Sequence, residues 1–265
     1  MQNLQHHYYL SYKPPEEEAE RATIEKKLVS LRCTKLHYSF WRVPQNEVRK
    51  VFETVRENHP LILKRSREII APQISFDKGI FDLGSVAIIA YTLSKKEMGK
   101  RVAVQRALRK TPRIRIGQSL YLIPYLKAAK LEMYKKKVML QDDLFDFLRK
   151  KRVDAHRLTH LKIVYPSSHK ELVKSMADLE AIICQKLALS LKKLAAEITK
   201  TPAEELLKLK KILSAYNVMY RTVNGVVFFL NEIMNIDLRN NLKKAYNYLI
   251  LCKKRYYAKL TYSTV

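Results

Sequence analysis

The feature that most constrains the fold is an internal repeat, which appears when the chain is aligned with itself at a shift of 80 residues. The matched pairs keep this shift without a gap, and they are Arg21 and Arg101, Ile24 and Val104, Leu28 and Leu108, Leu36 and Ile116, Ser39 and Ser119, and Pro44 and Pro124. The same shift carries the apolar segment 8–12 onto 88–92. A repeat of this kind indicates two copies of one supersecondary unit.

Each copy predicts strands that alternate with amphipathic helices, in the order β-α-β-α-β. The expected strands are residues 8–12, 36–43 and 61–64 in the first copy, and a strand from Val86, 113–123 and 161–165 in the second. The strand at 113–123 is expected to bend near Gly117, and a mostly helical insertion is expected over 127–152. The order is compatible with a ferredoxin-like α+β sandwich.

From Ser168 onward the pattern indicates helices only, with apolar residues three and four positions apart. Long amphipathic helices joined by short turns predict an antiparallel helical bundle. The fold class is therefore α+β, with two tandem ferredoxin-like domains before the bundle. The predicted domains are repeat 1 at 1–72, a linker at 73–84, repeat 2 with its helical insertion at 85–166, and the C-terminal bundle at 167–265.

Charge is the strongest functional signal, because 51 Lys and Arg face only 25 Asp and Glu, a formal net charge of +26. Residues 73–166 carry 21 basic and 8 acidic side chains, net +13, against +4 for 1–72 and +9 for 167–265. Such a surplus repels itself and is relieved by a polyanion. A lysine-rich surface of the thermophilic kind is the alternative, although such surfaces usually balance Lys with Glu.

The candidate nucleic-acid-binding residues are the basic side chains of repeat 2 and of the C-terminal helix. They are Lys95, Lys96, Lys100, Arg101, Arg106, Arg109, Lys110, Arg113, Arg115, Arg149, Lys150, Lys151, Arg152, Lys253, Lys254 and Arg255, and Lys135–Lys137 form a further run. Arg113 and Arg115 alternate on one strand, which would present them side by side to phosphates. For any single run, a solvated helix face is the competing interpretation. At the C-terminus we expect Tyr256 in the bundle seam and Tyr257 at its rim.

The residue types that carry catalysis or hold cofactors are sparse. With five glycines, the chain has no GxGxxG motif and no Walker-type phosphate loop. Asp142, Asp143 and Asp146 could hold magnesium, but they also suit the N-terminus of a helix. His156 and His160 lack an HExxH context. We therefore predict no catalytic residue, no metal and no cofactor.

Cysteine usage and segment hydropathy bear on where the protein works. Cys33, Cys184 and Cys252 are far apart and odd in number, which predicts neither a disulfide framework nor a zinc site. Residues 1–12 do not read as a signal peptide, and the longest apolar run near the C-terminus, 226–230, is too short to span a bilayer. These features favour a reducing, cytoplasmic compartment and no membrane.

The two copies share a motif, R-x2-[IV]-x3-L on a helix followed by a strand that ends [WY]-x-[VI]-P. The copies end in Trp41-Arg42-Val43-Pro44 and Tyr121-Leu122-Ile123-Pro124. The pattern resembles the ferredoxin-like core of CRISPR-associated small adaptation endonucleases and the N-terminal domain of chromate-resistance regulators, over residues 8–66 and 86–166. The resemblance implies nucleic-acid-associated work, and the tandem copies would mimic the dimer that the small endonucleases form. That endonuclease family places a metal-binding Asp at the end of the first strand, where this chain has Tyr12-Lys13 and Thr92-Leu93.

The sequence thus predicts a non-enzymatic nucleic-acid-binding protein, with DNA favoured over RNA, whose second repeat binds phosphates. Two alternatives stay open: a scaffold that forms a homodimer or recruits a protein partner through the C-terminal helices, and a metal-dependent nuclease that uses Asp142 or Asp143.

Overall fold

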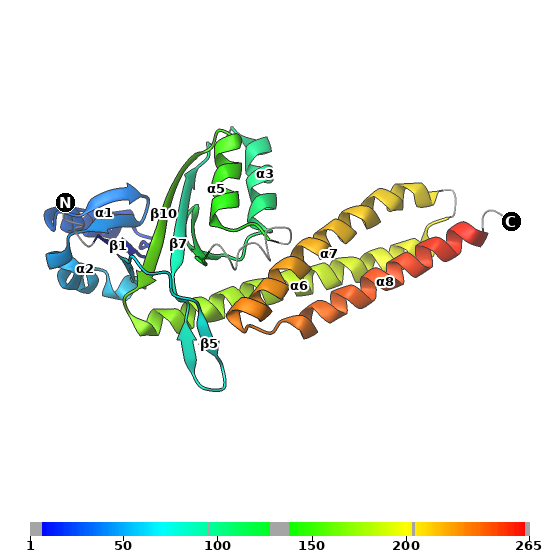
Figure 1. The fold of residues 1–265 in the computed structure, drawn as a ribbon. Coiled ribbons are helices and arrows are strands. Elements are labelled where there is room, and N and C mark those ends of the chain that lie inside the picture. Colours follow the sequence, from blue (N-terminus) through cyan, green and yellow to red (C-terminus); the bar gives the residue numbers. More distant parts are fainter. Residues whose placement is uncertain (1–6, 95, 128–137, 203–204, 263–265) are drawn as a thin grey trace. The chain divides into compact units, whose positions relative to one another are not determined.

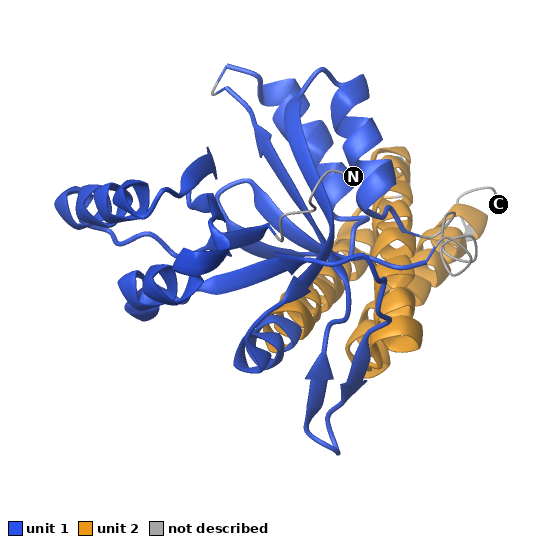
Figure 2. Ribbon diagram, turned by 60° about the vertical axis from the view of Figure 1, so that its left-hand side comes forward, with its two compact units in different colours: residues 1–173 blue, residues 174–265 orange. Residues whose placement is uncertain are grey.

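The structure is a computed structural model that describes residues 7–94, 96–127, 138–202 and 205–262. The chain divides into two compact units, residues 1–173 and 174–265 (Figure 2). The first unit is α+β and holds a large antiparallel sheet, whereas the second is helical. Within the described residues, no helix is both long enough and apolar enough to cross a membrane.

The first unit contains two halves with the same order of elements, β-α-β-β-α-β (Figure 1). The first half comprises β1 (Tyr8–Ser11), α1 (Glu18–Ser30), β2 (Thr34–His37), β3 (Phe40–Val43), α2 (Val48–Thr54) and β4 (Leu61–Arg65). The second half comprises β7 (Val86–Thr92), α3 (Met98–Leu108), β8 (Ile114–Gly117), β9 (Leu120–Pro124), α5 (Gln141–Lys150) and β10 (Asp154–Ile163).

The described strands of both halves form one sheet of eight strands in the order β2-β3-β1-β4-β10-β7-β9-β8. Every neighbouring pair is antiparallel. Each half contributes its strands in the order second, third, first, fourth. The two fourth strands, β4 and β10, pair with each other and place Leu161 opposite Arg65 and Ile163 opposite Leu63. One sheet therefore runs through both halves.

The expectation of single strands at 36–43 and 113–123 is wrong, because each segment is a β-hairpin. The chain reverses between β2 and β3, and again between β8 and β9, where Ser119 adopts a left-handed φ of 52°. The bend expected near Gly117 is a shift of register between Arg115 and Gly117, and the first half has the matching shift between Lys35 and His37. The two hairpins thus share this shift of register, but they differ at the turn, because Ser39 does not have the left-handed φ of Ser119.

The repeat shift of 80 holds for the hairpins but not for the first strand. The Tyr12 amide donates to the Ser39 carbonyl oxygen at 3.3 Å, and the Tyr91 amide donates to that of Ser119 at 3.1 Å. Tyr12 and Tyr91 are 79 residues apart, whereas the two serines are 80 apart. The segment 8–12 therefore corresponds to 87–91 rather than 88–92, and the connection from strand to helix differs by one residue.

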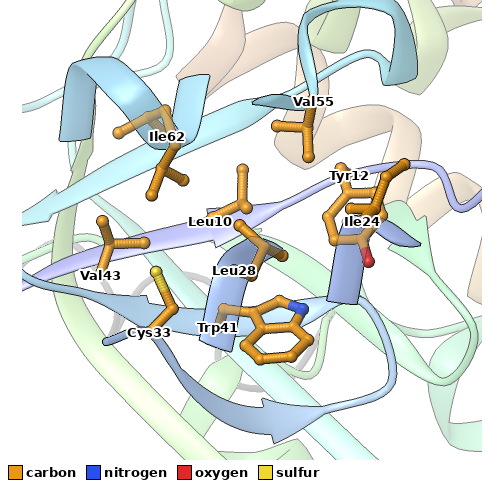
Figure 3. Packing of buried hydrophobic residues seen from close by; sticks show 10 residues of the cluster. Leu10, Tyr12, Ile24, Leu28, Cys33, Trp41, Val43, Val55 and Ile62 are labelled. Carbon is orange, nitrogen blue, oxygen red and sulfur yellow. The ribbon is translucent and has the colours of Figure 1, made fainter. Parts of the chain in front are cut away.

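Each half has a hydrophobic core between its part of the sheet and its two helices. In the first half this core includes Leu10, Leu28, Trp41, Val51 and Ile62 (Figure 3). In the second half the corresponding residues include Ile89, Val104, Leu108, Tyr121 and Leu144. Fully burying one such side chain stabilises the fold by about 1.5–3 kcal/mol. The matched apolar positions on the helices, Ile24 with Val104 and Leu28 with Leu108, are therefore core positions, whereas Leu36 and Ile116 are half-buried.

The opposite face of the sheet is buried as well. Because successive strand residues point to opposite faces, the residues that alternate with the core point away from the helices of their own half, and those buried there include Tyr9, Phe40, Leu63, Ile88 and Leu122. The Ser11 hydroxyl donates to the Ile116 carbonyl oxygen at 3.4 Å, which joins β1 to β8. We call the four strands that each half contributes a half-sheet. The two half-sheets therefore pack against each other through the faces opposite their helices.

The segment 73–84, expected as a linker, contains a small hairpin of β5 (Gln73–Ser75) and β6 (Ile80–Asp82). The chain then turns at Gly84, whose φ is +63°. A Cβ added to Gly84 would lie 2.4 Å from the Ile70 carbonyl oxygen, so the turn requires glycine. His169 lies at the start of α6 (Pro166–Lys200), and its Nδ1 accepts a hydrogen bond from the Leu83 amide at 2.9 Å.

The described part of the second unit consists of the remainder of α6, α7 (Leu206–Met234) and α8 (Arg239–Tyr262). The expected seam residues Leu209, Leu213, Val227 and Leu249 are buried. The Cys252 thiol donates to the Leu191 carbonyl oxygen at 3.3 Å. The three helices lie side by side, and each runs in the direction opposite to the helix before it (Figure 1).

Candidate nucleic-acid interface

Two helices of the second half, α3 and α5, carry most of the predicted binding residues together with the residues that directly flank them. They lie side by side on the sheet and run in opposite directions (Figure 1). Val104 and Leu108 of α3 and Leu144 and Leu148 of α5 face the core. Because a helix repeats every 3.6 residues, the positions on the opposite side of each helix point outward. The apolar stripes of these helices therefore direct their basic side chains to solvent.

The N-terminal end of α3 meets the C-terminal end of α5, and this brings seven basic residues together. The Lys100 ammonium donates to the Arg152 carbonyl oxygen at 3.2 Å. We name the group at this end the basic cluster, and it consists of Lys96, Lys100, Arg101, Arg149, Lys150, Lys151 and Arg152. All but the half-buried Lys100 are exposed. Lys95 lies outside the described residues, as do Lys135–Lys137.

The Glu97 carboxylate lies close to the basic cluster. Glu97 accepts from the Lys100 ammonium at 2.6 Å and from the Ser94 amide at 3.1 Å, and these hydrogen bonds lower the Glu97 pKa. The Arg101 guanidinium donates to the Ser94 carbonyl oxygen at 3.4 Å. Cations at the C-terminal end of α5 also interact favourably with the helix dipole. The basic cluster nevertheless keeps a positive surplus, because it contains seven cations and Glu97 forms its ion pair with Lys100.

The remaining cations of α3 lie at its other end. Arg106, Arg109 and Lys110 are exposed, but α3 has 11 residues and this end is displaced from the basic cluster along the helix. At about 1.5 Å per residue, the separation is roughly 10–15 Å. The Met139 amide donates to the Lys110 carbonyl oxygen at 2.8 Å, which brings this end close to the acidic start of α5. These three residues therefore extend the surface rather than belong to the basic cluster.

Arg113 differs from the expectation that it stands beside Arg115. Its guanidinium is buried and donates to the carbonyl oxygens of Leu108 and Thr111, the second at 3.2 Å. β8 begins at Ile114, so Arg113 precedes the alternation of the strand and turns back to the end of α3. Arg115 is exposed, and its Nε donates to the Gly117 carbonyl oxygen at 3.2 Å. Arg113 thus caps a helix, whereas Arg115 faces solvent.

The basic run at the end of α8 is largely occupied within the second unit. Lys253 donates to the Asn217 side chain at 3.1 Å, and Arg255 donates to the Ala195 carbonyl oxygen and the Thr199 hydroxyl, both at 2.9 Å. Arg255 therefore satisfies the C-terminal end of α6. Lys254 is exposed. As expected, Tyr256 is buried in the bundle, and Tyr257 is 62% exposed.

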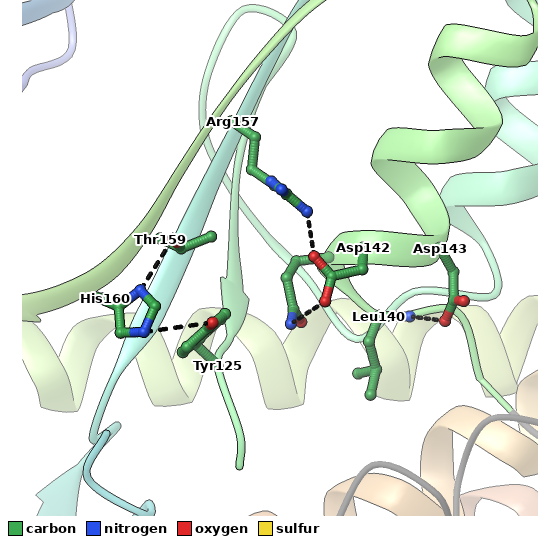
Figure 4. A network of polar contacts seen from close by, with 8 residues as sticks. Tyr125, Leu140, Asp142, Asp143, Arg157, Thr159 and His160 are labelled. Carbon is green, nitrogen blue, oxygen red and sulfur yellow. Dashed lines mark hydrogen bonds and ion pairs between the residues drawn. The ribbon is translucent and has the colours of Figure 1, made fainter. Parts of the chain in front are cut away.

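Two acidic residues at the start of α5, Asp142 and Asp143, have structural partners. Asp142 forms an ion pair with Arg157, and Asp143 accepts from the Leu140 amide at 3.1 Å (Figure 4). The prediction that these acids begin a helix is confirmed. Among the residues that the structure describes, no three His, Cys, Asp or Glu side chains are grouped so that they could hold a metal ion.

The paired histidines lie on a strand and not on a helix. His156 is exposed, with Nε2 3.8 Å from Asp154. The His160 ring contacts the Thr159 hydroxyl at 3.0 Å and the Tyr125 hydroxyl at 3.5 Å (Figure 4). The two side chains therefore have separate surroundings.

Sequence reasoning missed two cations of the first half, Arg32 and Arg42, which line a hollow of about 690 Å³ together with His7. The signal was present, since Arg42 alternates with the buried Trp41 and Val43 and must face away from the core.

A scan of protein-family models, a search of curated proteins and a search of solved structures found no significant match to this chain.

Proposed function

We propose that this protein binds nucleic acid without catalysis, with DNA favoured over RNA, and that the basic cluster contacts the phosphates. The observation that carries the proposal is the junction of α3 and α5, where the Lys100 ammonium contacts the Arg152 carbonyl oxygen and the two adjoining segments carry seven cations. Arg and Lys on one surface are the usual partners of phosphate oxygens. Arg106, Arg109, Lys110 and Arg115 would extend the contact, whereas Arg113 and Arg255 are occupied by backbone carbonyls.

We also propose that each half of the first unit is a ferredoxin-like domain. The element order and the strand order of each half support this, as do two helices packed on one face of the sheet. The packing of the two half-sheets against each other supports the view that the tandem copies act as a dimer within one chain. The basic cluster belongs to the second copy alone.

The test is a gel-shift titration of the full chain on duplex DNA, single-stranded DNA and RNA at several salt concentrations. We expect the logarithm of the binding constant to fall by about 0.9 per phosphate contact for each tenfold rise in salt. Changing both Lys150→Gln and Lys151→Gln should weaken binding to all sequences and reduce that slope by about 1–2.

The matched control changes Lys26→Gln and Lys27→Gln, which removes two exposed cations from α1 in the first half. This variant should keep nearly all of the affinity. Equal losses in the two double variants would contradict a localised contact and indicate attraction by net charge alone. Magnesium-dependent cleavage that Asp142→Asn abolishes would contradict the non-enzymatic assignment.

A protein-interaction scaffold is the second candidate, and exposed apolar residues of the second unit favour it. Leu189, Leu207 and Val218 are 60%, 69% and 58% exposed. Light scattering over a range of protein concentrations tests self-association, and Leu207→Gln should then shift the equilibrium toward monomer. A wild-type chain that stays monomeric at all concentrations argues against a homodimer.

A further inference from the structure

A small cavity lies where the two half-sheets face each other. It has a volume of about 230 Å³, and it is lined by Leu36, His37, Phe40 and Arg42 from the β2–β3 hairpin and by Ile88, Ala90, His156, Arg157 and Leu158 from β7 and β10. Ala90 is opposite His156 and Ile88 is opposite Leu158 in the register of β7 and β10, so these four share one face. The cavity therefore draws on both halves of the first unit.

The size and lining of this cavity suit one planar ring. Pockets that enclose a drug-sized ligand measure roughly 300–1,000 Å³, and this one is smaller. Five apolar side chains supply most of its wall, including Phe40, which stacks on Tyr9 with ring centroids 5.8 Å apart. An apolar wall with a few polar groups at its margin is the usual lining of a ligand site.

His37 supplies a polar group at this margin. Both of its ring nitrogens are buried and lack a hydrogen bond of good geometry among the described residues. Burial lowers the pKa of this imidazole, and the nearby Tyr91 backbone and Asp154 oppose that effect only in part. A neutral imidazole offers one donor and one acceptor, which is what the polar edge of a heterocyclic base requires.

Arg42 connects the cavity to a second, more polar hollow. This hollow, of about 690 Å³, is lined by His7, Arg32, Thr34, Arg42, Val43, Pro44, Gln45 and Asn46. No carboxylate is among the described residues that line either space. Arg42 lines both spaces, whereas Arg157 lines the cavity alone and is paired with Asp142. An apolar cavity thus adjoins an anion-attracting surface.

We propose that this pair of hollows binds a nucleotide, with the base in the cavity between the half-sheets and the phosphate on Arg42 and Arg32. The guanidinium fork matches phosphate oxygens, and the apolar wall removes the base from water. The nucleotide is either free or the end of a nucleic-acid strand, since both present the same groups. The inference is independent of the basic cluster, which shares no residue with these hollows.

The experiment is calorimetric titration of the full chain with adenosine monophosphate, at about 0.15 M salt to screen long-range attraction. Arg42→Met should weaken binding about tenfold, the loss expected for one charge-assisted contact. The matched control is Arg49→Met, an exposed cation on α2, and it should change affinity less than about twofold. Ala90→Leu should fill the cavity and weaken binding similarly. If circular dichroism shows that Ala90→Leu unfolds the protein, Ala90→Val is tested in its place.

Competition separates the parts of the ligand. Adenosine and inorganic phosphate should each compete more weakly than the nucleotide. A 5′-phosphorylated oligonucleotide that competes better than its unphosphorylated form identifies a strand end, whereas failure of both oligonucleotides to compete identifies a free nucleotide. The proposal is overturned if wild-type protein shows no saturable binding, if Arg42→Met binds as wild type does, or if inorganic phosphate binds as tightly as the nucleotide.

Discussion

His169 fixes the loop between β6 and β7 only while its imidazole is neutral. Nδ1 accepts the Leu83 amide proton and lies 3.6 Å from Asp82. Burial lowers the His169 pKa below its ordinary value of 6.5, although Asp82 opposes the shift. The unfolded chain therefore binds more protons than the folded chain below about pH 6.5, and stability must fall as the pH falls. The lowered pKa of His37 acts in the same direction.

We expect the melting temperature to fall as the pH is lowered from about 7.5 to about 5.5. His169→Asn should make the melting temperature depend less on pH. The asparagine side-chain oxygen can still accept from the Leu83 amide but does not titrate. Thermal melts followed by circular dichroism measure the effect. His156→Asn, at an exposed histidine, is the control and should leave the slope as it is. A His169→Asn slope equal to that of wild type would contradict this role.

Arg113 and Arg115 are two positions apart in the sequence but have different roles. Arg113→Met should lower the free energy of unfolding by about 1.5–3 kcal/mol, because the carbonyl oxygens of Leu108 and Thr111 lose a charged donor. Arg115→Met should cost less than about 0.5 kcal/mol, as exposed substitutions usually do. Urea denaturation compares the two variants. A larger loss of stability in Arg115→Met would show that the two roles are reversed.

At the scale of elements, the small hairpin β5–β6 depends on its two glycines unequally. Gly79 and Gly84 both have a left-handed φ, of 65° and 63°. A Cβ at Gly79 would have no neighbour within 4 Å, but at Gly84 it would lie 2.4 Å from the Ile70 carbonyl oxygen. Gly79→Ala should therefore cost about 1–2 kcal/mol, for the backbone conformation alone.

Gly84→Ala should cost clearly more than Gly79→Ala, because the backbone of residues 70 and 84 must also separate. The comparison uses the same urea denaturation, with each variant measured against wild type. Equal costs in the two variants would mean that the loop moves freely enough to accommodate a methyl group.

Helices and core positions could be predicted from the sequence, and the hairpins could not. The periodic spacing of Leu209, Leu213 and Val227 indicates a helix because packing repeats every turn. The turn before Phe40 lies inside an aromatic run, without the Asn-Gly or Asp-Gly that usually marks a hairpin. The matched serines, Ser39 and Ser119, stood at both turns, but a serine alone does not specify one.

The candidate site was predictable in part. Helix periodicity places Arg101 and Arg149 on the outer faces of α3 and α5, and the structure brings the N-terminal end of α3 next to the C-terminal end of α5. The burial of Arg113 depends on where β8 begins, and the cavity beside Arg42 depends on contact between the half-sheets. The first depends on a local turn, since the carbonyl oxygens that Arg113 contacts belong to Leu108 and Thr111. The second is set by packing between residues far apart in the chain, which local patterns do not encode.

At the scale of the whole molecule, charge acts on folding and on binding in opposite directions. A net charge of +26 destabilises the compact state by self-repulsion, and salt screens that repulsion. Raising salt from about 0.05 to about 0.5 M should therefore raise the melting temperature, by about 2–4 °C per kcal/mol gained, while it weakens DNA binding. Thermal melts of the free protein measure the first effect, and a melting temperature that falls with salt would contradict it.

The pairing of β4 with β10 has a consequence for synthesis on the ribosome. A nascent chain that ends before residue 154 contains β4 and β7 but lacks the strand that lies between them. Each would then expose a row of unpaired backbone groups, which is a template for association between chains. We therefore expect the first unit to complete its fold only after residue 163 has left the exit tunnel, so that a chaperone acting on the emerging polypeptide would protect it up to that point.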